Sequence, residues 1–235
     1  MRVLALDTST RTGSLAVVED GRIIVERGGD GSRTQTERLP NDIVDMLRSI
    51  GRTTTDVDLF AVASGPGSFT GLRTGIATIQ GLAFVHNKRV APISVLRALA
   101  EAAVSGLAIG ARVGAWMDAH RREVFSGLYE VLLPAEHGIA LLGEIEAPMV
   151  GTAADTLGRW SSMGLPVRIC GDGVMTYQAV LPGSIEAVPP PLLAGTIGRL
   201  AIASHNARGT VPPAGVQPLY VRRPDVELAR DARRS

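Results

Sequence analysis

Residues 64–75 constrain this chain more than any other segment, because they read SGPGSFTGLRTG and hold four glycines and a proline. A loop this rich in glycine bends sharply and exposes backbone N–H groups. The apolar run IATIQGLAF follows and predicts a helix over residues 70–86 with small residues on its surface. Such a junction can hold an anion at the helix N-terminus or let a second helix approach closely. The first use indicates an enzyme, and the second a partner of one.

Composition narrows the class of protein. At 235 residues the chain suits one large domain or two small lobes. Its 45% hydrophobic and 20% charged residues are typical of a soluble globular protein. A net charge of +1 argues against tight unaided binding to nucleic acid. The single cysteine, Cys170, allows no intrachain disulfide. With no signal-peptide pattern and no membrane-length apolar run, we expect a cytoplasmic protein.

Hydrophobic periodicity and turn residues predict an alternating α/β chain. Expected strands cover residues 3–6, 14–18, 22–26, 58–63, 89–92, 111–117, 124–129 and 166–170, and expected helices cover 38–50, 70–86, 94–105 and 192–206. Loops are expected over 182–191 and after Gly209, where prolines gather.

One pattern occurs twice along the chain. A hydrophobic strand ends at Asp7 and a hairpin follows, and a second such strand ends at Asp118 before another hairpin. We interpret this as a duplication that gives two lobes, residues 1–106 and 107–235, facing each other over a cleft. We also expect the C-terminal segment of the second lobe to pack back on the first. The alternative is a pair of unrelated hairpins, because the two halves share a pattern and little sequence identity.

Six sequence blocks in a fixed order carry a family resemblance. They are LALDTST, SGPGSFTGLRTGIATIQGLA, PISVL, MDAHRREVF, ICGDG and PLYVRR, and together they span almost the whole chain. On these blocks the chain resembles the bacterial TsaB (YeaZ) family, and the GPGSFTGLR block is the most specific of them. The chain departs from that family at residues 35–38, which read QTER where members often carry a His-Ser pair before Leu39-Pro40.

The resemblance implies a fold and a function. The fold would be the duplicated actin-like ATPase (ribonuclease H-like) α/β fold. The protein would be a non-catalytic relative of the TsaD-type subunit. That subunit transfers a threonylcarbamoyl group from threonylcarbamoyl-adenylate to N6 of adenosine 37, in tRNAs that read codons beginning with A. Implied partners are the TsaD-type subunit, a TsaE-type P-loop ATPase, tRNA through the complex, and a second copy when the protein is alone.

Two turns are candidates for a vestigial nucleotide site. In actin-like ATPases an acid at the first hairpin turn holds a metal-bound water while hydroxyl and N–H groups hold phosphate. The matching residues are Asp7, Thr8, Ser9 and Thr10, and a second phosphate turn is formed by Gly171, Asp172 and Gly173. Both sets also suit purely structural turns. The segment 194–198 is the one candidate for an adenosine loop, and its surroundings look helical.

Other catalytic and metal chemistry finds little support in the sequence. The four histidines are His86, His120, His137 and His205, and no two lie within five residues of each other. A helix therefore cannot present the His-x-x-x-His pair of the catalytic relatives, so we expect no metal and no catalytic residue. Cys170 is expected to be a small buried apolar residue. We expect this subunit to require no cofactor of its own, with ATP or ADP and Mg²⁺ entering at the level of the complex.

The helix over 70–86 is the expected partner interface. Leu72, Ile76, Ile79 and Ala83 share one face, and Gly71 and Gly75 lie beside it. Glycine costs about 1 kcal/mol against alanine within a helix, so a large neighbour must approach there. That neighbour is either this lobe's own sheet or a helix of another chain, which the resemblance favours. The predicted interface residues are Gly71, Leu72, Arg73, Gly75, Ile76 and Ile79.

Arg73 opposes the helix macrodipole, which suggests a carboxylate or phosphate partner for its guanidinium. The basic pairs Arg121-Arg122 and Arg222-Arg223 are expected to add local phosphate contacts. The preferred reading is a scaffold subunit that holds a catalytic relative in its competent conformation. The alternatives are a free-standing actin-like ATPase or phosphotransferase, and a peptidase, against which the lack of a nucleophile–base pair argues.

Overall fold

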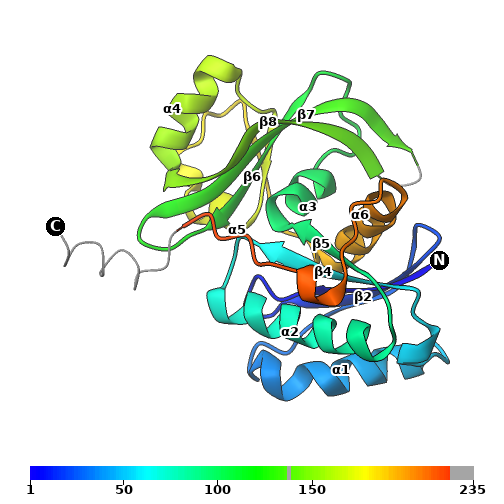
Figure 1. The fold of residues 1–235 in the computed structure, drawn as a ribbon. Helices are drawn as coiled ribbons and strands as arrows, with labels where there is room; N and C mark the ends of the chain where they lie inside the picture. Colours follow the sequence, from blue (N-terminus) through cyan, green and yellow to red (C-terminus); the bar gives the residue numbers. More distant parts are fainter. Residues whose placement is uncertain (137–138, 223–235) are drawn as a thin grey trace.

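The computed structural model describes residues 1–136 and 139–222, and shows two lobes, each built on a five-stranded mixed sheet (Figure 1). The expectations for His137, for Arg223 and for the tail over 223–235 lie outside the described residues. Within the described part of the chain, no helix is long and apolar enough to cross a membrane.

Both sheets have the same strand order. The first contains β1 (Arg2–Asp7), β2 (Ser14–Glu19), β3 (Arg22–Gly28), β4 (Leu59–Gly65) and β5 (Val90–Ser94) in the order β3-β2-β1-β4-β5. The second contains β6 (Arg112–Asp118), β7 (Glu123–Glu136), β8 (Ile139–Thr152), β9 (Arg168–Cys170) and β10 (Glu186–Val188) in the order β8-β7-β6-β9-β10. Each sheet pairs its first two strands antiparallel and its first and fourth strands parallel. The duplicated actin-like fold is therefore confirmed, and the alternative of two unrelated hairpins is wrong.

The helices also repeat, but with unequal lengths. They are α1 (Gln35–Ser49), α2 (Phe69–Val85), α3 (Val95–Ala102), α4 (Ala153–Met163), α5 (Asp172–Thr176) and α6 (Ala194–Asn206), with 3-10 turns at Thr54–Asp56, Gln178–Val180 and Pro213–Gly215. α2 and α5 occupy the same place in their lobes, between the fourth and fifth strands. α2 has 17 residues and α5 has five, so the long helix is a feature of the first lobe.

Several elements differ from the sequence prediction. β8, α4 and β10 were not predicted, and β10 falls inside the segment expected to be a loop. β8 escapes a simple alternation pattern because its pairing with β7 shifts register repeatedly. Residues 172 and 173, predicted as part of a phosphate turn, are the first residues of α5. Ser94 is the N-cap of α3, since its side chain accepts a hydrogen bond from the N–H of Arg97.

One hydrophobic core joins the two lobes. It combines residues of the first sheet such as Val3 and Ala16 with residues of the second such as Val113 and Tyr129. α3 and α6 lie between the sheets, with α6 packed on β1 and β2 (Figure 1). Gly198 allows this close approach, because a Cβ there would lie 2.5 Å from Cγ2 of Val18. The candidate adenosine loop over 194–198 is therefore the packed first part of a helix.

The segment 193–216 packs on the first lobe. Ser14 Oγ in β2 accepts hydrogen bonds from the N–H groups of Leu193 and Ala194, at 3.3 and 3.0 Å. Glu26 in β3 accepts from Gly195 N at 2.7 Å. These bonds satisfy first-turn donors of α6, which would otherwise be unpaired. After α6, Val211 forms an antiparallel β-bridge with Val90 of β5. Gln80 of α2 then donates a hydrogen bond to the carbonyl of Pro213.

Candidate functional site

A cavity of about 1000 Å³ lies between the two lobes. Its walls come from the β1–β2 turn, the N-terminal ends of α1 and α2, the β6–β7 turn, the start of α5 and the segment 219–222. This is the cleft that the duplicated fold predicts. Of the candidate nucleotide residues, Ser9, Thr10 and Asp172 line it, whereas Asp7, Thr8, Gly171 and Gly173 do not.

Three of the four candidate residues at the first turn are buried, and Thr10 is half-buried. Asp7 is 4% exposed, Thr8 is fully buried and Ser9 is 3% exposed. The Asp7 carboxylate accepts a hydrogen bond from Ser9 N at 2.8 Å, which stabilises the turn locally. Burial raises the pKa of Asp7 above its ordinary value, because desolvation disfavours the charged form more than the Ser9 hydrogen bonds favour it.

α2 covers this turn directly. Ser68, the N-cap of α2, donates its backbone N–H to the carbonyl of Ser9 at 2.7 Å. A Cβ on Gly71 would lie 2.2 Å from the carbonyl oxygen of Thr8, and a Cβ on Gly75 would lie 2.1 Å from Thr8 Oγ1. The two glycines are therefore required so that Thr8 can sit against the helix.

A metal-bound nucleotide does not fit at the first turn in this conformation. Phosphate binding needs accessible backbone N–H groups, and a metal-bound water needs a charged, accessible carboxylate. Here Asp7, Thr8 and Ser9 are buried, α2 packs against Thr8, and desolvation raises the pKa of Asp7. Across residues 1–136 and 139–222, no group of three His, Cys, Asp or Glu side chains could hold a metal ion.

The second candidate turn is held by close packing on β6. A Cβ on Gly171 would lie 1.9 Å from the carbonyl oxygen of Trp116, and one on Gly173 would lie 2.9 Å from the carbonyl carbon of Met117. Asp172 accepts a hydrogen bond from Asp118 N at 2.9 Å and so fixes the end of β6. Burial is also the main cause that raises the pKa of Asp172. Gly171, Asp172 and Gly173 therefore pack against β6 and fix its end.

The predicted interface on α2 requires a correction. Gly71, Leu72, Gly75, Ile76 and Ile79 are buried within the protein itself, and Arg73 alone of the six predicted residues is exposed. Leu72 packs in the core between the lobes, whereas Ile76 and Ile79 pack with α1, β1 and β4. The close approach that the two glycines predict is confirmed, but the group that approaches Gly71 and Gly75 is this chain's own Thr8.

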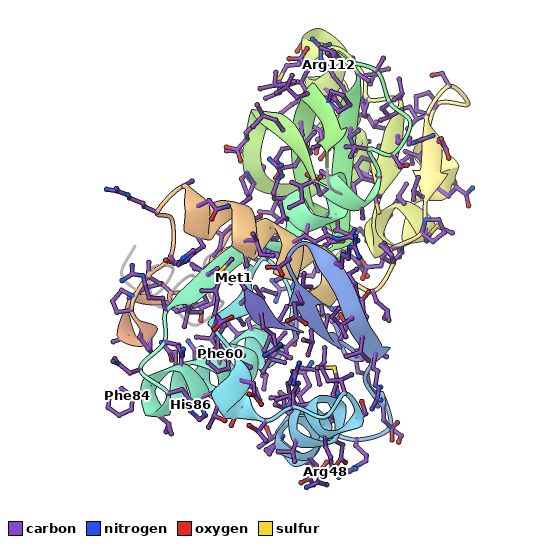
Figure 2. The ribbon with its side chains drawn as sticks, turned by 90° about the vertical axis from the view of Figure 1, so that its right-hand side faces the viewer. Met1, Arg48, Phe60, Phe84, His86 and Arg112 are labelled. Atoms are coloured by element: carbon purple, nitrogen blue, oxygen red, sulfur yellow. The ribbon has the colours of Figure 1, made fainter. Side chains whose placement is uncertain are left out.

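The opposite side of α2 is exposed. Five exposed residues define what we call the outer α2 face: Thr70, Arg73, Ala77, Gly81 and Phe84. Among the described residues nothing lies within 4 Å of a Cβ built on Gly81. Phe84 is 78% exposed and its ring projects away from the body of the protein (Figure 2). The neighbouring Val85 is 76% exposed, so the C-terminal end of α2 presents an uncovered apolar surface.

Arg73 finds partners within the chain that the sequence did not predict. Its guanidinium lies 3.8 Å from the centre of the Phe69 ring, and its Nε donates to Tyr220 Oη at 2.9 Å. The rings of Phe69 and Tyr220 are 5.5 Å apart. The unexpected partner Tyr220 belongs to the PLYVRR block, so the sequence carried a signal for it without showing its contact.

The segment 219–222 connects the two lobes across the cavity. Leu219 donates its N–H to the carbonyl of Ser64 at the end of β4, at 2.7 Å. Arg222 donates to the carbonyl of Ala119 at 2.8 Å and pairs with Glu123, both on the second lobe. These four residues therefore form a strap over the cleft.

The chain is similar to a known protein family and to two curated proteins. The model described as "TsaD: tRNA N6-adenosine threonylcarbamoyltransferase" matches residues 29–175. The chain is 40% identical over 125 residues to the tRNA threonylcarbamoyladenosine biosynthesis protein TsaB of Haemophilus influenzae, covering 53% of this chain and 52% of that protein. It is 35% identical over 130 residues to TsaB of Escherichia coli, covering 55% of each. The chain thus spans about half the length of these two curated relatives.

Longer matches agree with this assignment. An uncharacterized protein of Mycobacterium tuberculosis is 31% identical over 227 residues, which cover 96% of this chain and 93% of that protein. The crystal structure of YeaZ from Pseudomonas aeruginosa superposes with a TM-score of 0.73 at 28% identity, covering 93% of this chain and 99% of that one. A second Pseudomonas aeruginosa structure, described as similar to peptidase YEAZ, gives a TM-score of 0.78 at 30% identity over 94% of this chain and 99% of that one. The chain belongs to the TsaB (YeaZ) family of tRNA threonylcarbamoyladenosine biosynthesis proteins, which is related to TsaD.

Proposed function

We propose that the protein is a scaffold subunit that activates a TsaD-type catalytic relative. The complex would transfer a threonylcarbamoyl group from threonylcarbamoyl-adenylate to N6 of adenosine 37, in tRNAs that read codons beginning with A. A TsaE-type P-loop ATPase would join the two, and ATP or ADP with Mg²⁺ would be used by the other subunits. Such a complex acts where tRNA is, so we place the protein in the cytoplasm.

One observation carries the proposal: the outer α2 face is exposed while the inner face of the same helix is buried. Phe84 is 78% exposed at the C-terminal end of this face, and the open Gly81 lies one turn before it (Figure 2). Apolar surface that a monomer leaves uncovered is characteristic of an interaction site. Small residues at Ala77 and Gly81 would let a partner helix approach the backbone. The same face would serve a homodimer when the catalytic relative is absent.

The buried first turn argues against the alternative of a free-standing ATPase or phosphotransferase. A phosphate could reach Thr8 only if α2 lifted away from it, although Gly71 and Gly75 fit that residue closely. Activation by a scaffold needs no chemistry in this chain; it needs higher affinity for the active arrangement of the partner than for the inactive one. A protein whose first candidate turn is packed against α2 and whose outer α2 face is exposed suits that mechanism.

An add-back assay tests the proposal. Unmodified tRNA, threonylcarbamoyl-adenylate and ATP are incubated with purified TsaD-type and TsaE-type subunits, with or without this protein. Modified adenosine is then measured by mass spectrometry. We expect modification to require the protein, and Asp7→Asn to support it as well as the wild type does. Full modification without the protein would refute the scaffold role. Loss of modification with Asp7→Asn, with the fold intact, would restore the nucleotide-site alternative.

A further inference from the structure

The interlobe cavity presents aromatic surface on one wall. Phe69 and Tyr220 are 45% and 39% exposed, and both line the cavity. Their rings lie 5.5 Å apart, and Arg73 covers one face of Phe69. Exposed rings of this kind offer flat faces on which an unpaired nucleobase can stack.

Basic side chains from both lobes line the same cavity. Arg11 and Arg33 line it from the first lobe and each donates to a backbone carbonyl. His120 lines it from the second lobe beside Arg222, which pairs with Glu123. The acidic lining residues already serve the backbone: Asp118 accepts from His120 N at 2.9 Å, and Asp172 accepts from Asp118 N at 2.9 Å. Basic groups on both sides of an opening match a chain of phosphates that crosses it.

The β6–β7 turn adds a second, independent observation. His120, Arg121 and Arg122 follow one another with φ values of 58°, 54° and 65°, and all three are exposed. Residues with a Cβ rarely adopt this left-handed conformation, and hairpins normally place asparagine or glycine there. A backbone outlier of this kind points from strain to function. Here His120 lines the cavity, and the exposed Arg121 and Arg122 follow it directly in the same turn.

We propose that the interlobe cleft binds an unpaired loop of RNA. The phosphates would contact the basic residues at the mouth, and one unstacked base would lie against Phe69 and Tyr220. This inference rests on the proposed function, because it assigns to this subunit a contact with the tRNA that the complex modifies. A cavity of about 1000 Å³ admits an unstacked nucleotide but not a duplex. With a net charge of +1, the isolated protein would bind such RNA weakly and with strong salt dependence.

The test uses a double variant of the β6–β7 turn that removes two positive charges and also relieves the unfavourable left-handed backbone conformation. Arg121→Asn combined with Arg122→Gly places the preferred residues at the left-handed positions, so thermal stability should not fall. The matched control is Arg208→Asn, because Arg208 is also an exposed arginine in the left-handed region, with φ of 60°, and does not line the cavity. Tyr220→Leu tests base stacking separately.

The probes are a fluorescein-labelled single-stranded RNA heptamer and the same sequence in a duplex, titrated with the full-length protein at several salt concentrations. We expect the turn variant to bind the heptamer about tenfold more weakly, and to lower the salt slope by about 1.4, which corresponds to two lost phosphate contacts. Tyr220→Leu should also weaken binding about tenfold, through lost stacking. Arg208→Asn should bind as the wild type does, and the duplex should bind less tightly than the heptamer.

Equal RNA binding by the wild type and the turn variant would overturn the inference. So would a turn variant that binds RNA normally but no longer co-elutes with the catalytic relative, because the basic turn would then contact protein. The RNA titration needs no partner subunit. Failure of the add-back assay with intact, variant-sensitive RNA binding would therefore refute the scaffold role and support the RNA site.

Discussion

Two glycine-to-alanine substitutions in the same helix should have opposite effects on stability. Gly75 of α2 faces Thr8, and an added Cβ would lie 2.1 Å from Thr8 Oγ1 and 3.0 Å from its Cγ2. Gly81 lies less than two turns further along, with nothing within 4 Å of its Cβ position among the described residues. The chemical change is identical, so the difference between the variants measures how Thr8 fills the helix surface.

The expected magnitudes follow from these distances. Replacing glycine by alanine within a helix gains about 1 kcal/mol. Gly81→Ala should show that gain in full. At Gly75 the buried Thr8 cannot move aside easily, and overpacking of this kind costs about 1–3 kcal/mol. The free energy of unfolding of Gly75→Ala should therefore fall below that of Gly81→Ala by about 1–3 kcal/mol, or roughly 2–4 °C in Tm per kcal/mol.

Denaturant unfolding of both glycine variants, each made in the wild type and in a Thr8→Ala protein, tests this packing argument. Thr8→Ala removes the two closest atoms and leaves Thr8 Cβ, 3.1 Å from the new methyl group. The cost of Gly75→Ala should then shrink, with an interaction energy of about 1 kcal/mol or more. If Gly75→Ala stabilised the protein as much as Gly81→Ala does, the packing argument for the inner face of α2 would be refuted.

Three further predictions concern other parts of the protein. Burial raises the pKa of Asp7, so the protonated side chain stabilises the folded protein fully below the unfolded pKa, and this contribution is lost as the pH rises through the folded pKa. Asp7→Asn should therefore be more stable than the wild type at pH 7. Urea titrations at several pH values should show the two free energies of unfolding converging as the pH falls toward 3.8. Ser14→Ala removes the acceptor for the N–H groups of Leu193 and Ala194 and should cost about 1–2 kcal/mol by denaturant unfolding, whereas an unchanged midpoint would mean that other groups hold the start of α6. Phe84→Ala should leave the fold within about 0.5 kcal/mol of wild type. It should also weaken self-association or partner binding by about 2 kcal/mol, roughly 30-fold in Kd, in analytical ultracentrifugation. An unchanged Kd would remove Phe84 from the interface.

Local chemistry made much of the fold predictable. A hydrophobic strand that ends at an acid and turns back is a short-range pattern, and it identified both Asp7 and Asp118 as equivalent strand ends. The long helix after the glycine-rich loop was equally clear, because small and apolar residues recur at helical spacing. β8 was missed because the β7–β8 pairing changes register several times, which removes the regular alternation that marks a strand.

Contacts between distant parts of the chain at the candidate site could not be predicted from the sequence. The cost of Gly75 indicates that something comes close to the helix, but its neighbour Thr8 is far away in the sequence and is brought there by the fold. Arg73 was expected to meet an acidic group, because its position opposes the macrodipole. The structure instead gives it an aromatic ring and a tyrosine hydroxyl, which no local pattern could specify.

The central claim is that the outer α2 face of this protein docks on a catalytic relative and thereby supports tRNA modification. Gly81→Arg tests it most directly, with Gly158→Arg as the matched control, since Gly158 is also an exposed helical glycine with open space around it among the described residues. We predict that both variants fold, that Gly81→Arg neither co-elutes with the TsaD-type subunit nor supports threonylcarbamoylation, and that Gly158→Arg does both. Wild-type assembly and modification by a folded Gly81→Arg variant would contradict the claim.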